Sequence, residues 1–170
     1  KDIVLCGHGM GGAITLLYAL RYPEELKGII LMGTGARPYV NPDKMERCRQ
    51  PGPENSEWLA GYMESFAGVA PDMHSVLSQR AVELGPEVQL NDLLACDGFD
   101  VMDQLGEIDL PTQVLCGSED MVTPVKYADY LTEHMQNVRE TIIPGGSHFF
   151  QMEEYKIVNE EIENFMASLK

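Results

Sequence analysis

The sequence predicts an α/β fold in which a parallel sheet is flanked by helices. Short apolar runs alternate with segments of helical periodicity, and this alternation is typical of parallel sheets. The first run, residues 2–6, shows no polar alternation, as expected of a strand buried on both faces. The chain has 170 residues, which is enough to bury the core of one domain.

Glycine and proline residues mark where the predicted elements end. A glycine-rich turn follows the first strand, and Pro23 stops the first helix. Pro124 precedes a later helix, and Pro144 closes the last strand. The expected strands are residues 2–6, 27–32, 112–116 and 139–143, and the expected helices are residues 13–22, 125–135 and 155–169.

Residues 36–105 interrupt this alternation and are rich in Met, Pro and acidic side chains. We interpret them as a helical cap inserted into a core that is formed by residues 1–35 and 106–170. Apolar side chains within it recur at helical spacing. They favour a plain core for the insertion over a pocket wall, and both interpretations stay open for Trp58, Tyr62, Met63 and Phe66. Val76, Leu77, Val82 and Leu84 indicate another helix.

Composition excludes several classes of function. The formal net charge of −15, without any basic stripe, argues against nucleic-acid binding. No apolar run reaches the roughly 18 residues of a membrane span, and no signal peptide opens the chain, so we expect a cytoplasmic protein. The spacing of the cysteines and histidines predicts reduced, buried thiols and no metal site. The cysteines are Cys6, Cys48, Cys96 and Cys116.

Residues 7–12, GHGMGG, fit two functional patterns. The first is G-x-G-x-x-G, the dinucleotide-binding turn, which requires an acidic residue about 20 residues further on, where the next strand ends. Residues 29–33 contain no acid, and Glu24 and Glu25 precede the strand. We therefore expect no nicotinamide cofactor.

The second pattern is G-x-S-x-G, the nucleophile elbow, with Gly9 where the serine stands. An elbow serine needs a histidine to take its proton and a carboxylate to orient that histidine. Asp120 and His148 follow the third and fourth predicted strands, in the chain order nucleophile, acid, histidine. Side chains at the carboxyl ends of parallel strands lie where α/β sheets build their sites.

Four stretches carry a resemblance to a known family: VLCGHGMGG, YPEELKGIILMGTGA, FDVMDQLGEIDLPTQVLCGSED and IPGGSH. The chain resembles the α/β-hydrolase superfamily, in its branch of small-substrate esterases, lactonases and carbon–carbon bond hydrolases. The resemblance implies hydrolysis of a small-molecule acyl substrate without any cofactor. Asp120, chosen over Glu119 by the family's G-x-x-D spacing, is then the triad acid and His148 the general base. The Met10 N–H is then an oxyanion donor, and pocket candidates are His8, Met121, Val122 and the four cap residues Trp58, Tyr62, Met63 and Phe66.

Gly9 departs from the family pattern because glycine has no atom that can attack a carbonyl. Loss of a triad nucleophile typically lowers turnover about a million-fold, so we expect a nearly inactive protein. Glycine tolerates the strained elbow backbone at little cost. A substitution introduced to trap a ligand and a naturally non-catalytic relative both fit. The alternative function is a binding or interaction module on a hydrolase scaffold.

A second departure is that the sequence opens directly on the elbow strand, at Lys1. By analogy it would hold only strands five to eight of the family. The apolar edge at Ile3–Leu5 is then expected to pair with a missing amino-terminal half or with a second copy.

Overall fold

Four parallel strands form the sheet of this protein, in the order β1-β2-β3-β4. They are β1 (Ile3–His8), β2 (Leu26–Met32), β3 (Thr112–Gly117) and β4 (Val138–Ile143). The structure is a computed structural model that describes residues 3–50 and 56–169. It confirms the predicted α/β class with a parallel sheet and flanking helices.

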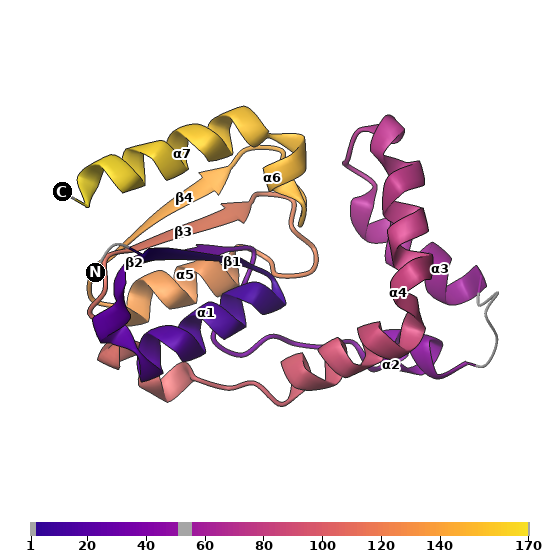
Figure 1. Cartoon of the computed structure of the whole chain (residues 1–170), viewed down its shortest axis with the longest axis horizontal. Coiled ribbons are helices and arrows are strands. Elements are labelled where there is room, and N and C mark those ends of the chain that lie inside the picture. The colour runs from indigo at the N-terminus through magenta and orange to yellow at the C-terminus, as the bar shows by residue number, and fades with distance from the viewer. Residues whose placement is uncertain (1–2, 51–55, 170) are drawn as a thin grey trace.

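Helices cover both faces of the sheet (Figure 1). On one face lie α1 (Met10–Arg21) and α5 (Lys126–His134), and on the other α6 (Phe150–Glu153) and α7 (Tyr155–Ser168). Alternate residues of β2 feed the two cores, because successive side chains of a strand point to opposite faces. Ile29 and Leu31 pack in the core with α1, and Ile30 packs in the core with α7.

The segment between β2 and β3 folds as helices that face the carboxyl ends of the strands (Figure 1). Helix α4 is kinked at Gly85 (φ 77°), directly before Pro86, which cannot donate a helical hydrogen bond. The apolar side chains of Val76, Val82 and Leu84 are exposed on this helix. The described helices of the segment are α2 (Pro42–Arg49), α3 (Ser56–Met63) and α4 (Pro71–Asp97). The described residues also form the 3-10 turns η1 (Pro23–Glu25), η2 (Glu64–Phe66) and η3 (Met102–Glu107).

The prediction of four buried thiols is correct for two of them. Cys48 and Cys116 are buried, whereas Cys96 is half-buried and Cys6 is exposed. Cys6 is exposed because β1 pairs only with β2 in the described sheet and so lies at its edge. Ile3 on the same strand is 53% exposed, and the pairing of this edge with further chain stays a prediction.

Neither a membrane-spanning helix nor a metal cluster is present in the described part of the chain. Its helices lack the combination of length and apolar character that crossing a bilayer requires. Residues 3–50 and 56–169 also hold no group of three or more His, Cys, Asp or Glu side chains that could ligate a metal ion.

Helix α1 packs so closely against β1 and against the segment that follows β2 that two glycines are required. A Cβ at Gly7 would lie 2.1 Å from the carbonyl oxygen of Gly11, and a Cβ at Gly12 would lie 2.4 Å from Thr34 Cγ2. Both separations are far below van der Waals contact. Neighbouring Gly11 differs, since a Cβ there would meet no atom within 4 Å outside its own helix.

Gly7→Ala is therefore expected to lower the free energy of unfolding by about 1–3 kcal/mol or more, because the strand and helix must separate. The matched control is Gly11→Ala, which should be neutral or stabilising by up to about 1 kcal/mol, as alanine favours helix. Urea unfolding of the protein as it is encoded in full measures both changes. Equal losses in the two variants would contradict this account of the packing.

Candidate active site

A sharp turn at Gly9 joins β1 to α1 with φ 55° and ψ −120°. Side chains of L-amino acids rarely adopt this positive φ. The Gly9 amide donates to the Met32 carbonyl at 3.0 Å, and its carbonyl accepts from Thr34 Oγ1 at 2.8 Å. The turn is thereby fixed by the end of the neighbouring strand β2.

Two loops bring a carboxylate and an imidazole together beside this turn. Asp120 follows β3, His148 follows β4, and His148 Nδ1 lies 2.8 Å from Asp120 Oδ2. The amides of Val122 and Thr123 each donate to Asp120 Oδ1 at 2.8 Å, and Thr123 Oγ1 donates to Oδ2 at 2.9 Å. Asp120 is only 3% exposed, so these donors replace the water that the carboxylate loses.

Asp120 is held in its ionised form. Burial by itself raises the pKa of this carboxyl, but the hydrogen bond with His148 and those from Thr123 outweigh burial and bring the pKa below its usual range. An ionised carboxylate only accepts hydrogen bonds, so it favours the His148 tautomer with the proton on Nδ1. Nε2 of His148 is then the unprotonated nitrogen.

That nitrogen faces the turn. A Cβ built on Gly9 would lie 3.5 Å from His148 Nε2 and 3.9 Å from Cε1, and no other described atom outside Gly9 and its two chain neighbours would lie within 4 Å. Gly33, at φ 49°, allows β2 to end close to the pair, since a Cβ there would lie 3.3 Å from both Asp120 Oδ2 and His148 Nδ1. The structure thus brings Gly9, Asp120 and His148 together in space.

His8, which precedes the turn, ties β1 to the histidine loop. Its Nε2 donates to the His148 carbonyl at 2.8 Å, and the two rings lie 4.6 Å apart between centroids. Desolvation, aided by the charge of His148, lowers the pKa of His8 to about 4. His8 is therefore neutral near pH 7. The sequence indicated His8 only as a pocket candidate, and it gave no sign of this bond.

A cavity of about 460 Å³ opens over Gly9 and His148. Four of the seven predicted pocket residues line it, namely His8, Tyr62, Met121 and Val122. Met10 also lines it, and as the first residue of α1 its amide has no acceptor within the helix. The walls come from both the sheet region and the inserted helices, which contribute Lys44, Gln89 and Asp92 among others.

Trp58, Met63 and Phe66 are not among the residues that line this cavity. Phe66 is buried and stacks on Phe149, next to His148, with ring centroids 4.1 Å apart. It therefore joins the inserted helices to the histidine loop. Trp58 and Phe66 are buried, so their helical spacing reflects packing of the insertion rather than a wall of this cavity. Met63 is half-buried.

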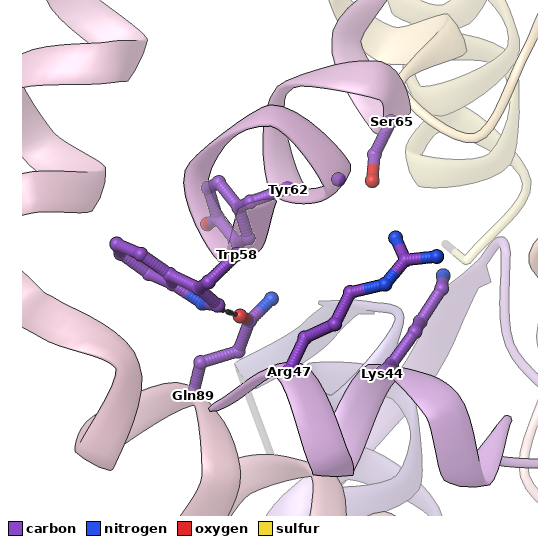
Figure 2. A pocket seen from close by; sticks show the side chains of 7 residues that line it. Lys44, Arg47, Trp58, Tyr62, Ser65 and Gln89 are labelled. Atoms are coloured by element: carbon purple, nitrogen blue, oxygen red, sulfur yellow. Dashed lines mark hydrogen bonds between the residues drawn. The ribbon is translucent and has the colours of Figure 1, made fainter. Parts of the chain in front are cut away.

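Trp58 borders a smaller hollow between α2, α3 and α4 (Figure 2). Its Nε1 donates to Gln89 Oε1, and Lys44 and Arg47 extend beside one another from α2 (Figure 2). Arg47 lies against α3, since a Cβ at Gly61 would be 2.5 Å from Arg47 Nη1. Lys44 and Gln89 border both this hollow and the larger cavity.

The fold is that of an α/β-hydrolase. More narrowly, residues 1–155 match the family described as serine aminopeptidase, S33, and the chain belongs to that family.

The proteins that this chain is similar to include hydrolases and esterases. The 2-hydroxy-6-oxo-6-phenylhexa-2,4-dienoate hydrolase of Burkholderia cepacia is 27% identical over 178 residues, which cover 96% of this chain and 62% of the relative. A thermophilic esterase structure has a TM-score of 0.87 at 29% identity, covering 98% of this chain and 66% of that one. The structure of a lipase-esterase related protein from Clostridium acetobutylicum ATCC 824 has a TM-score of 0.81 at 30% identity. The match covers 97% of this chain and 66% of that chain. The chain spans less than two thirds of the length of each of these proteins.

The lowered pKa of Asp120 makes stability depend on pH in a defined direction. Because the folded pKa lies below the unfolded value, ionised Asp120 contributes stability above about pH 4 that is lost as pH falls through the folded pKa. Asp120→Asn should therefore be less stable than the parent protein near neutrality, and the difference should shrink in acid. Urea unfolding between about pH 6 and pH 3 tests this, with exposed Asp109→Asn as the control. A difference that stays constant across this range would refute the assignment.

Proposed function

We propose that this protein has the fold and site of a hydrolase that acts on a small ester, lactone or related acyl substrate. Gly9 cannot supply the serine nucleophile, so the protein is nearly inactive by the mechanism that uses a serine. One observation carries the proposal. A side chain at position 9 would begin 3.5 Å from Nε2 of a histidine whose other nitrogen is bonded to a buried carboxylate. That is the arrangement a nucleophile and its base require.

In the parent reaction a serine at position 9 attacks the acyl carbonyl and His148 takes its proton. Asp120 keeps the imidazole oriented and stabilises the imidazolium. The Met10 amide, at the amino terminus of α1, donates to the developing oxyanion, where the helix dipole also favours negative charge. His148 then returns the proton to the leaving group.

Nearby side chains do not replace the lost hydroxyl. Ser118 Oγ accepts a hydrogen bond from the Gly145 amide at 2.9 Å, and Ser147 Oγ donates to Glu153. Both hydroxyls are engaged within the loops that follow β3 and β4. Cys96 lines the cavity, but burial, aided by the charge of Asp92, raises the pKa of its thiol and disfavours the thiolate. Gly9 therefore removes the chemistry of the parent reaction.

The cavity supports a small acyl substrate. Its volume of about 460 Å³ is in the range of small-molecule sites, and the chain is similar to an esterase and to a dienoate hydrolase. The same observations keep a second function open, in which the protein binds such a molecule without converting it. Gly9 favours this alternative, because it removes the nucleophile and leaves the cavity beside His148.

Gly9→Ser in the protein as it is encoded in full distinguishes the two. A disabled hydrolase should gain about 10³-fold or more in turnover of 4-nitrophenyl butyrate, by the scale of nucleophile deletions. The gain should vanish when His148→Ala is added. Serine must adopt the positive φ of the turn, so we also expect a loss of about 1–3 kcal/mol in the free energy of unfolding.

Gly9→Ala is the matched control, because it imposes the same backbone strain without a hydroxyl. It should lose similar stability and gain no turnover by an acyl-enzyme route. A folded Gly9→Ser protein that binds the ester but does not hydrolyse it would favour the binding module.

A further inference from the structure

Glycine at position 9 leaves room beside a histidine that is otherwise set up as a base. Apart from Gly9 itself and its chain neighbours His8 and Met10, a Cβ at this position would have only the His148 ring within 4 Å among the described residues. Gly9 and His148 both line the cavity of about 460 Å³, so the volume is continuous with the proposed substrate site.

We propose that this protein transfers acyl groups directly to a small external nucleophile that occupies the side-chain volume of Gly9. Water, a short alcohol and hydroxylamine have the required size and an O–H or N–H to donate. The inference rests on the proposed function in one respect, namely that the acyl substrate binds in the cavity. It adds an activity of the glycine-containing protein itself.

The geometry places such a nucleophile where it can be activated. A donor oxygen or nitrogen bonded to His148 Nε2 lies about 2.8–3.0 Å from it. A side chain at position 9 would begin 3.5 Å from the same nitrogen, so the two compete for one volume. A methyl group there should displace the external nucleophile.

The reaction needs no further reactant. The nucleophile's oxygen or nitrogen bonds to the acyl carbon while its proton passes to His148 Nε2, and the carbonyl electrons move to the oxygen near the Met10 amide. Collapse of this intermediate re-forms the carbonyl and breaks the ester C–O bond. His148 gives its proton to the leaving alcohol, or the alcohol leaves as the anion when it is acidic. The products are the free acid from water and a hydroxamate from hydroxylamine, and no covalent acyl-enzyme forms.

Other groups at the site are not suited to be the base. His8 already donates through Nε2 to the His148 carbonyl, and its pKa of about 4 makes it a weak base. Asp120 is buried and its oxygens accept bonds from His148, Val122 and Thr123. The proton acceptor is therefore His148 Nε2.

The test uses the protein as it is encoded in full, with 4-nitrophenyl butyrate and increasing hydroxylamine. After subtraction of the reaction in buffer, release of nitrophenolate and formation of butyryl hydroxamate should rise together with hydroxylamine concentration. Intact-protein mass spectrometry should find no butyryl adduct. The rate should fall about tenfold to a hundredfold in Gly9→Ala and in His148→Ala, because correct placement and the base are lost.

Gly85→Ala controls for backbone strain. Gly85 also has a positive φ, 77°, and a Cβ there would meet nothing within 4 Å. This variant should keep the hydroxylamine-dependent rate if it folds. Thermal unfolding shows whether each variant is folded. Because Gly9→Ala and His148→Ala are each expected to lower the hydroxylamine-dependent rate, either variant can test the proposal if the other one unfolds.

The outcomes separate the two proposals. If Gly9→Ser hydrolyses the ester but the glycine protein forms no hydroxamate, direct transfer is overturned and the hydrolase assignment stands. If folded Gly9→Ala or His148→Ala keeps the full hydroxylamine-dependent rate, direct transfer is also overturned. If neither Gly9→Ser nor the glycine protein turns over the ester, both proposals fall.

Discussion

The hydrogen bond between Asp120 and His148 depends on the order of the strands. The two residues lie 28 positions apart in the chain, in loops that follow the adjacent parallel strands β3 and β4. Parallel pairing brings both loops to the same edge of the sheet, and β2 beside them positions the turn at Gly9 through Met32 and Thr34. A change in strand order or register would separate the three positions even if every side chain were kept.

A second set of contacts joins this edge to the inserted helices. Phe66 stacks on Phe149, directly after His148, and Glu153 accepts from the Ser147 amide directly before it at 2.7 Å. A Cβ at Gly68 would lie 2.4 Å from Glu153 Oε1, so the insertion also reaches this carboxylate. The backbone on both sides of the imidazole is thus fixed by groups outside the acid–histidine pair. Movement of the insertion would be transmitted to His148 as well as to the cavity wall.

The sequence was sufficient to predict those features that depend on local patterns of residues. The four described strands were predicted, and strand ends with chain order placed an acid and His148 at one edge of the sheet, whereas the choice of Asp120 over Glu119 came from the family resemblance. Thr123 was missed as a partner of Asp120, although a hydroxyl three residues after the acid is a recognisable local hydrogen-bonding pattern. The bond from His8 to the His148 carbonyl spans 140 residues, and no local pattern could have indicated it. Helical spacing marked Trp58 and Phe66 as inward-facing but could not say which interior they face. The exposure of Cys6 depends on strand order, which an apolar run does not encode.

The positive φ at Gly9 makes glycine and serine energetically unequal at this position. Exchange of serine for glycine relaxes the turn, so a lineage that no longer needs the hydroxyl gains folding stability from losing it. The reverse exchange must bear the conformational penalty before any catalytic benefit is selected. Folding stability at such a turn therefore favours glycine, whereas catalysis by a nucleophile would require a residue that bears the strain.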